Sequence, residues 1–292
     1  RLILTCGSHP FIPPIAGATR QGVSPLRTLQ QADEVLAQIK PGMKCVCIGG
    51  GILGLETAGG LARRGIDVTV MENFAWLLPR QLNETAARRL QDHAQGLGLA
   101  FQTNALTKQI IGDERARGVM LEDGRVFDAD LVVVATGIRP NSYLTRQAGL
   151  RVDKGIVVDS LLRTSHDSVF AAGDVAEFQG NLYGLWEPAR FQGTIAGKNA
   201  AGQAVEFGGM PRMNTLKVLG LDMFSVGDVM PQDGSYDSIE SDTDGVYTRF
   251  LIHDNRLAGA ILLGDTHLAA AATQAVRDRA DLSGVLATSR TA

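Results

Sequence analysis

Residues 45–56 read CVCIGGGILGLE. The stretch begins as a short apolar strand and continues as a helix predicted to extend to about Arg64. Between strand and helix lie the glycines of a Gly-x-Gly-x-x-Gly turn: Gly49, Gly51 and Gly54. A second apolar strand, residues 67–71, follows and ends at Glu72. Strand, glycine turn, helix, strand and acid in this order are the pattern of a dinucleotide-binding site.

Each part of this pattern has a physical role. The glycines allow a tight turn and let the backbone approach a pyrophosphate. The start of the helix, at Ile52 and Leu53, would face that pyrophosphate with unpaired N–H groups and the positive end of the helix dipole. Glu72 would accept hydrogen bonds from the adenosine ribose hydroxyls. The alternative is a glycine-rich turn without a ligand, with Glu72 as a surface acid at a strand end.

Composition narrows the class of protein. The chain has 292 residues, 45% hydrophobic and 20% charged, with a formal net charge of −3, enough for two or three domains. There is no basic excess to indicate nucleic acid binding and no run of about 20 apolar residues to span a membrane. Three cysteines are too few for a disulfide framework and indicate a reducing compartment, so we expect a cytoplasmic protein.

The cysteines and histidines do not predict a metal site. Cys45 and Cys47 fall on one face of a strand, which favours small buried residues over a redox pair. The five histidines are scattered, and no Cys/His cluster has the spacing of zinc ligands.

The remaining chain alternates strands and helices. Apolar periodicity predicts helices at residues 27–39, 84–98, about 189–201 and about 267–280, with Asn83 as an N-cap. It predicts strands at residues 99–103, 130–136, 155–159, 168–172, 246–253 and 257–263. The fully apolar strand at 130–136 is typical of the interior of a parallel sheet.

Two strand ends resemble each other. Residues 3–10 read ILTCGSHP and residues 133–140 read VVATGIRP, each an apolar strand followed by Gly and then Pro three positions later. This partial repeat indicates two related nucleotide-binding domains; chance similarity is the alternative.

Four motifs in chain order are similar to those of the FAD-dependent NAD(P)H reductases in the pyridine nucleotide–disulfide oxidoreductase family. They are LILTCGSHPFIPPI (2–15), CIGGGILGLETA (47–58), DLVVVATGIRPN (130–141) and SVFAAGDVAE (168–177). Two further stretches, 214–228 and 256–271, resemble the small C-terminal domain of rubredoxin reductases and of the flavin-binding part of nitrite reductase large subunits.

The resemblance implies an α/β fold with two Rossmann-like, three-layer nucleotide-binding domains and a small C-terminal α+β domain. A partial FAD-binding domain would comprise residues 1–22 and 147–203, with the NAD(H)-binding domain, 23–146, inserted in it; the C-terminal domain would be 204–292. The family's first Gly-x-Gly-x-x-Gly motif is absent, and the chain starts within a strand. We therefore expect roughly 100 further residues before Arg1, a few βαβ units.

The resemblance also implies roles for Glu56 and Gly137 of the NAD(H)-binding domain. Glu56 would approach the nicotinamide and the flavin, as the catalytic residue, and Gly137 would pack against the nicotinamide nucleotide. The alternative for Glu56 is an acid in the first helical turn that interacts with the helix dipole.

In the FAD-binding domain, Asp174 would bind a ribityl hydroxyl of FAD, and Gly173 would permit close approach. A helix cap is the alternative for Asp174. A helix beginning near Glu187 would point its N-terminus at the flavin. Cys6 and Gly7 would lie near FAD, with Cys6 in place of the family's usual threonine.

These expectations lead to a functional hypothesis. Hydride would pass from NADH to FAD, and electrons would then pass to a small redox protein, rubredoxin-like or a related metalloprotein. NADH is favoured over NADPH because Glu72 would repel a 2′-phosphate. The alternatives are a thiol/disulfide reductase or NADH oxidase with a cysteine in the preceding segment, and a non-catalytic nucleotide-binding module. A homodimer is left open.

Overall fold

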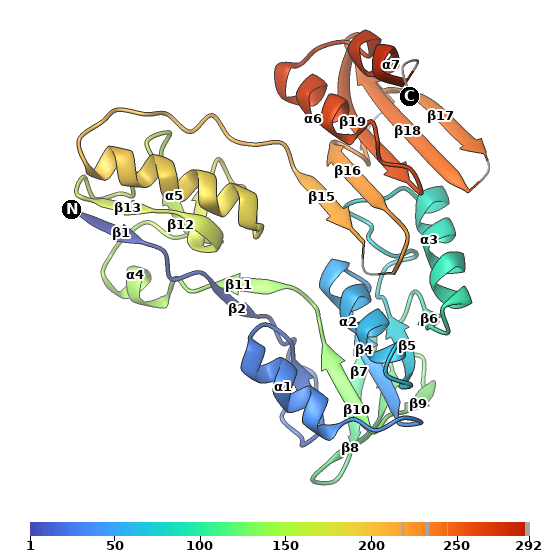
Figure 1. Ribbon diagram of the computed structural model, residues 1–292. Helices are drawn as coiled ribbons and strands as arrows, with labels where there is room; N and C mark the ends of the chain where they lie inside the picture. Colours follow the sequence, from blue (N-terminus) through green and yellow to red (C-terminus); the bar gives the residue numbers. More distant parts are fainter. Residues whose placement is uncertain (218, 232–233, 244, 290–292) are drawn as a thin grey trace. The chain divides into compact units, whose positions relative to one another are not determined.

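A computed structural model describes residues 1–217, 219–231, 234–243 and 245–289 of the chain (Figure 1). Contacts divide the chain into two compact units. Unit 1 consists of Arg1–Phe11 and Gly137–Met210, and unit 2 consists of Ile12–Thr136 and Pro211–Ala292. Each of the two units is therefore built from two separate segments of the chain.

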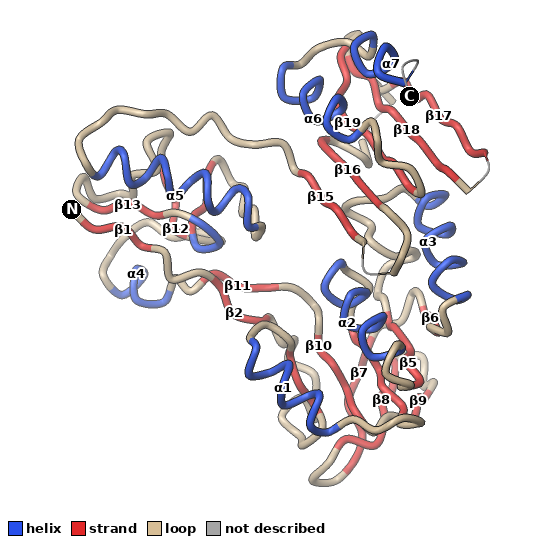
Figure 2. Tube along the Cα trace, in the orientation of Figure 1, coloured by secondary structure: helices blue, strands red, loops and turns tan. Residues whose placement is uncertain are grey.

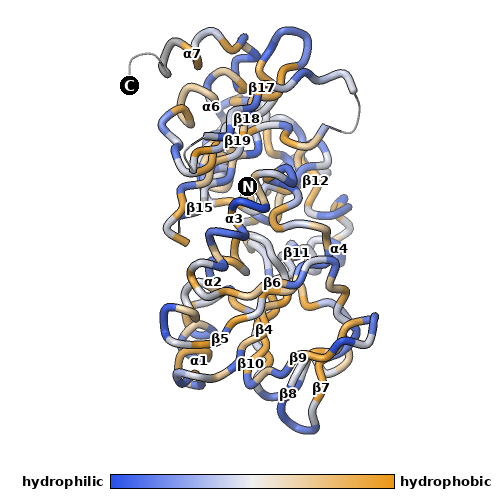
Figure 3. The backbone as a smooth tube through the Cα atoms, turned by 90° about the vertical axis from the view of Figure 1, so that its right-hand side faces the viewer, coloured by the Kyte–Doolittle hydropathy of each residue, from blue (hydrophilic) through white to orange (hydrophobic). Residues whose placement is uncertain are grey.

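Unit 2 contains a five-stranded parallel sheet with the order β3-β10-β4-β5-β6. Its strands are β3 (Val23–Pro25), β10 (Leu131–Val134), β4 (Lys44–Ile48), β5 (Asp67–Met71) and β6 (Ala100–Gln102). All four residues of β10 and the last four of β4 are buried, and Figure 3 shows both strands as hydrophobic. Apolar strands of this kind need cover on both faces, as is usual for parallel sheets.

Helices connect the parallel strands. Helix α2 (Ile52–Ala62) joins β4 to β5, and α3 (Glu84–Gly96) joins β5 to β6, while α1 (Leu29–Gln38) precedes β4. The predicted N-cap of α3 is confirmed, because Asn83 Oδ1 accepts a hydrogen bond from Ala86 N at 3.2 Å. This alternation of parallel strands and helices is the Rossmann-type arrangement that the glycine motif predicts.

Beside the parallel sheet lies a three-stranded antiparallel sheet, β7 (Thr107–Gly112), β8 (Ala116–Leu121) and β9 (Val126–Asp128). Residues 12–22 run along it, with isolated bridges from Ala16 to Gln109 and from Gln21 to Arg115. Unit 2 therefore contains residues 12–22, which the sequence assigns to the FAD-binding domain. At the other junction, residues 137–146 belong to unit 1 instead of the NAD(H)-binding segment.

Unit 1 has three pairs of strands. In two of them the strands are parallel: β1 (Leu2–Leu4) with β13 (Val169–Ala171), and β12 (Ile156–Val158) with β14 (Ala176–Phe178). The 15-residue helix α5 (Trp186–Ala200) packs on the first pair, and the short helices α4 (Tyr143–Gln147) and η1 (Gly173–Val175) complete the unit. Its apolar core includes Phe170, Ile195 and Phe207.

The two similar stretches, residues 3–10 and 133–140, contain strands that pair with each other. Strand β2 (Ser8–Pro10) pairs antiparallel with β11 (Ile138–Pro140), the corresponding part of the second motif. Backbone hydrogen bonds flank this pair, from Phe11 N to Gly137 O and from Asn141 N to Gly7 O, both at 2.9 Å. The two similar stretches of sequence therefore pair with each other as antiparallel strands in unit 1.

The C-terminal domain, residues 211–292, forms an antiparallel sheet with the order β15-β16-β19-β18-β17. Its elements are β15 (Met213–Leu216), β16 (Met223–Gly227), β17 (Asp237–Thr243), β18 (Val246–His253), β19 (Arg256–Leu263), α6 (Ala269–Asp278) and α7 (Ser283–Ser289). Figure 2 shows α6 and α7 beside these strands. The strands predicted at 246–253 and 257–263 are confirmed as β18 and β19, which form a hairpin with Asp254 and Asn255 at φ values of +51° and +59°, as a tight two-residue turn requires.

None of the described helices is long and apolar enough to cross a membrane. The fold as a whole agrees with the predicted class, a mixed α/β protein with Rossmann-type domains and a small C-terminal sheet domain.

Candidate functional site

The glycine turn joins β4 to α2 in unit 2. Gly49 has φ +114°, and a Cβ there would lie 2.4 Å from the carbonyl oxygen of Ala135, so the position favours glycine on both grounds. A Cβ on Gly54 would overlap the carbonyl oxygen of Gly49. These two glycines therefore let α2 pack closely against the end of the sheet.

Gly51 has a different role. It is the N-cap of α2 and provides no side-chain cap, so the N–H groups of the first turn, including those of Ile52 and Leu53, are not capped by a side chain. A Cβ on Gly51 would meet nothing within 4 Å. The turn therefore leaves open space in front of helix N–H groups, which fits the pyrophosphate of a dinucleotide.

Glu72 lies at the end of β5, beside this turn, and only 7% of its surface is exposed. Its Oε2 accepts a hydrogen bond from Gly50 N at 2.9 Å, and its Oε1 accepts one from Phe74 N at 3.0 Å. The reading of Glu72 as a surface acid is therefore wrong. The carboxylate fixes the middle of the glycine turn, a contact that the sequence did not predict.

Glu56 lies on α2 and is half-buried. It is the fifth residue of the helix, so the prediction that it lies in the first helical turn is wrong, and no acid lies in that turn. Burial raises the pKa of the Glu56 carboxyl above its ordinary value of 4.5. A carboxyl with a raised pKa can hold or release a proton closer to neutral pH.

The two cysteines of β4 behave as the sequence predicts. Cys45 and Cys47 are 1% and 0% exposed. Burial raises the pKa of the Cys47 thiol to about 12, and that thiol donates a hydrogen bond to Gly54 O at 3.5 Å. A neutral buried thiol is a poor nucleophile, so these side chains serve packing.

In unit 1, three predicted residues lie in neighbouring segments. Ser8 Oγ, one residue after Gly7, donates a hydrogen bond to Asp174 Oδ2 at 2.7 Å. Gly173, with φ +83°, precedes Asp174 and donates its N–H to Gln192 Oε1 at 2.8 Å. The residue after Gly7 is thus hydrogen-bonded to Asp174, which follows Gly173 in the chain.

Gln192 was missed by the sequence analysis. It lies on α5 and is fully buried, and its Nε2 has no hydrogen-bond partner in the described structure. An unpaired buried amide is costly, and an acceptor on a bound group would satisfy it. This orphaned donor beside Gly173 fits a polar cofactor in unit 1. Nothing in the sequence around position 192 distinguishes it from other polar residues of the helix.

Cys6 and Gly137 flank the paired strands β2 and β11. Cys6 is exposed, and its thiol donates to Asn141 O at 3.2 Å while Asn141 Nδ2 donates to Cys6 O at 2.7 Å. A Cβ on Gly137 would meet nothing within 4 Å, so the chain is open to a ligand at this position.

Glu187 lies in the first turn of α5, which begins at Trp186, close to the helix start predicted near Glu187. Glu187 Oε2 lies 3.4 Å from an Arg190 nitrogen, and the Arg190 guanidinium lies over the Trp186 ring at 5.6 Å. Trp186 is 73% exposed, so it is not a core residue.

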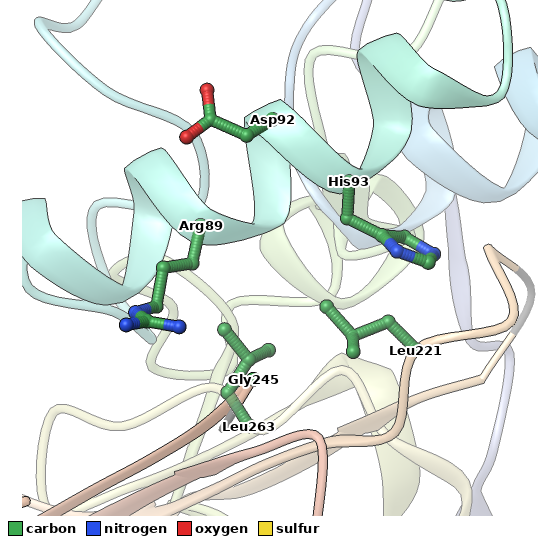
Figure 4. A pocket seen from close by; sticks show the side chains of 6 residues that line it. All are labelled: Arg89, Asp92, His93, Leu221, Gly245 and Leu263. Atoms are coloured by element: carbon green, nitrogen blue, oxygen red, sulfur yellow. The ribbon is translucent and has the colours of Figure 1, made fainter. Parts of the chain in front are cut away.

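A cavity of about 440 Å³ lies elsewhere in unit 2, between α3 and the C-terminal domain (Figure 4). Its lining consists of Arg89, Asp92, His93, Leu221, Gly245 and Leu263. None of the predicted site residues borders it, so it is distinct from the glycine turn.

Comparisons with known proteins agree with this arrangement. Residues 1–193 match the pyridine nucleotide-disulphide oxidoreductase family, and residues 213–280 match the rubredoxin NAD+ reductase C-terminal domain. Nitrite reductase [NAD(P)H] of Bacillus subtilis is 37% identical over 97% of this chain and 35% of its own length. The chain thus spans about a third of that relative.

Two further proteins extend the comparison. Nitric oxide reductase FlRd-NAD(+) reductase of Salmonella agona is 29% identical over 91% of this chain and 70% of its own length. A solved NAD-dependent persulfide reductase from A. fulgidus has a TM-score of 0.90 at 26% identity, covering 96% of this chain and 57% of its own. The chain belongs to the pyridine nucleotide-disulphide oxidoreductase family.

Proposed function

We propose that this chain is the NADH-binding and part of the FAD-binding region of a flavoprotein oxidoreductase that passes electrons to a small redox protein. The open N-terminus of α2 at Gly51, with Glu72 beside it, is the observation that carries the proposal. Family membership supports the same class of reaction.

Glu72 determines which dinucleotide binds. An ionised carboxylate offers about four acceptor sites. Two are used by Gly50 N and Phe74 N, which leaves capacity for the ribose hydroxyls. The carboxylate would repel the 2′-phosphate of NADPH, and the next residues, Asn73 and Phe74, supply no cation to offset that repulsion. NADH is therefore the expected donor.

Unit 1 would hold the flavin part of the site. FAD, when bound, accepts a hydride and can release electrons one at a time. Asp174 would accept a hydrogen bond from a ribityl hydroxyl, next to its contact with Ser8. The unpaired Gln192 Nε2 would donate to an acceptor of the cofactor. Glu56 would approach the nicotinamide and the flavin from α2, and its carboxyl, with its raised pKa, would hold a proton beside them.

The acceptor we propose is a rubredoxin-like or related small metalloprotein. The match of residues 213–280 to the rubredoxin NAD+ reductase C-terminal domain supports this choice, as does the similarity to the Salmonella agona reductase. The three free cysteines suit a reducing compartment, for which we propose the cytoplasm.

Anaerobic titration of the purified protein that carries this chain tests the proposal. We expect bound flavin, rapid bleaching of its visible absorption band by NADH, much slower bleaching by NADPH, and reoxidation on adding oxidised rubredoxin. Absence of flavin would contradict the proposed reaction. Faster bleaching by NADPH would contradict the role of Glu72, and reduction of disulfides in place of rubredoxin would contradict the acceptor.

A further inference from the structure

The ten residues 73–82 lie between Glu72 and the start of α3, and they hold the glycine turn. Both backbone polar groups of Gly50 are hydrogen-bonded, one to Glu72 and the other to Leu78 of this segment. Its N–H donates to Glu72 Oε2 at 2.9 Å, and its carbonyl oxygen accepts a hydrogen bond from Leu78 N at 3.3 Å. Phe74 N donates to the other Glu72 oxygen. The position of Gly50 therefore depends on the conformation of residues 73–82.

This segment contains a strained residue. Leu78 has φ +54°, in the left-handed region that a bulky residue seldom adopts, and it is 1% exposed. The turn that follows depends on it, because Gln81 N and Leu82 N both donate to Leu78 O, at 2.8 and 2.9 Å. A conformation of this kind persists only when surrounding contacts hold it.

The far end of the segment is held by the C-terminal domain. Asn83 caps α3 with its Oδ1 and donates its Nδ2 to Tyr247 Oη at 2.6 Å. Tyr247 lies on β18, is 1% exposed and donates its hydroxyl to Glu240 Oε2 at 3.0 Å. Burial raises the pKa of Tyr247 to about 12, so the hydroxyl remains protonated and can make both hydrogen bonds.

Two further side chains of α3 also contact the C-terminal domain. Arg89 Nε donates to Asp242 Oδ2 at 3.0 Å, and His93 Nε2 lies 2.7 Å from Leu219 O. Figure 4 shows Arg89 and His93 extending from α3 on the side of the C-terminal residues. Apolar packing joins the same parts of the chain. One core cluster contains both Leu78, from residues 73–82, and Leu263 of the C-terminal domain.

We infer that Tyr247 is a positioning residue for the dinucleotide site, acting through Asn83 and residues 73–82 on Gly50. This inference rests on the proposed function, since it concerns the site that would bind NADH. The C-terminal domain then has a role in nucleotide affinity, because it stabilises the conformation in which Gly50 and Glu72 face the ligand.

Removing the Tyr247 hydroxyl tests the inference. Tyr247→Phe keeps the ring, and Asn83→Ser keeps a good N-cap while removing the donor to Tyr247. Calorimetric titration of the full-length protein with NADH, well below the unfolding temperature, should show a dissociation constant raised about three- to tenfold in each variant, the effect of one lost hydrogen bond. The double variant should bind NADH no more weakly than Tyr247→Phe alone, because that substitution already removes the hydrogen bond to Asn83.

Tyr236→Phe is the matched control. Tyr236 also lies in the C-terminal domain, and its hydroxyl bonds Asp228 of that domain at 3.2 Å, so its removal should leave the NADH dissociation constant unchanged. An unchanged dissociation constant in Tyr247→Phe, with only a lower unfolding temperature, would overturn the inference and leave the proposed function standing. Failure of the unsubstituted protein to bind NADH would overturn both.

Discussion

Glu72 illustrates how a residue's type can be predictable when its contacts are not. The sequence places an acid at the end of β5, as a dinucleotide site requires. The hydrogen bonds to Gly50 and Phe74 depend on how the chain folds back after the strand, which residue spacing does not encode. The structure thus adds a second task for this carboxylate, which is to hold the glycine turn.

Glu56 gives a prediction of pH dependence. Its folded-state pKa is raised by burial above 4.5, so the folded protein binds this proton more tightly than the unfolded chain does. The stability that comes from the protonated group is present below that value and is lost as pH rises through the folded pKa. Glu56→Gln, which cannot ionise, should therefore gain stability relative to the unsubstituted protein between about pH 4 and pH 8.

Urea unfolding in the absence of nucleotide, followed across this pH range, measures the difference in free energy of unfolding between the two proteins. A difference that stays constant with pH would contradict the effect of burial on Glu56.

At the scale of elements, the close contact of α2 with the end of β4 rests on Gly54. A methyl group there would overlap the carbonyl oxygen of Gly49, which belongs to the backbone and cannot move aside cheaply. Gly54→Ala should lower the free energy of unfolding by about 1–3 kcal/mol.

Gly60 provides the comparison within the same helix. A Cβ there would meet nothing within 4 Å, so Gly60→Ala should raise stability by about 0.5–1 kcal/mol through better helix propensity. Equal effects of the two substitutions in urea unfolding would show that helix propensity, and not the contact with Gly49, governs the response.

Elements with strong local signals were predictable. Asn83 fixes the start of α3, and the pair Asp254-Asn255 fixes the hairpin of β18 and β19, because caps and tight turns depend on residues close in sequence. Residues 12–22 lie in unit 2, and their bridges to residues 109 and 115 are tertiary contacts that no local pattern encodes. The start of α5 at Trp186 lies one residue from the start predicted near Glu187, and Pro188 is tolerated within that first helical turn.

At the scale of the whole molecule, the sequence order conceals which parts share a core. The C-terminal domain reads as a separate unit, yet its residues Met223, Tyr247 and Leu263 belong to one apolar cluster with Leu55 and Leu90 of the parallel sheet's helices. The hydrogen bond from Asn83 to Tyr247 joins residues 164 positions apart. No local pattern predicts such a contact between the segment that precedes α3 and the C-terminal domain, both of which lie in unit 2.

Gly51→Ala tests most directly the central claim that the glycine turn binds NADH. The Gly51 backbone, at φ −77° and ψ 177°, accepts alanine, and the new methyl group would meet no atom of the protein within 4 Å. The unfolding temperature should therefore fall by about 4 °C or less, the effect of a poorer N-cap. The methyl group would occupy the space proposed for the pyrophosphate, so calorimetric titration should show at least about tenfold weaker NADH binding. NADH binding as tight as that of the unsubstituted protein would contradict the account.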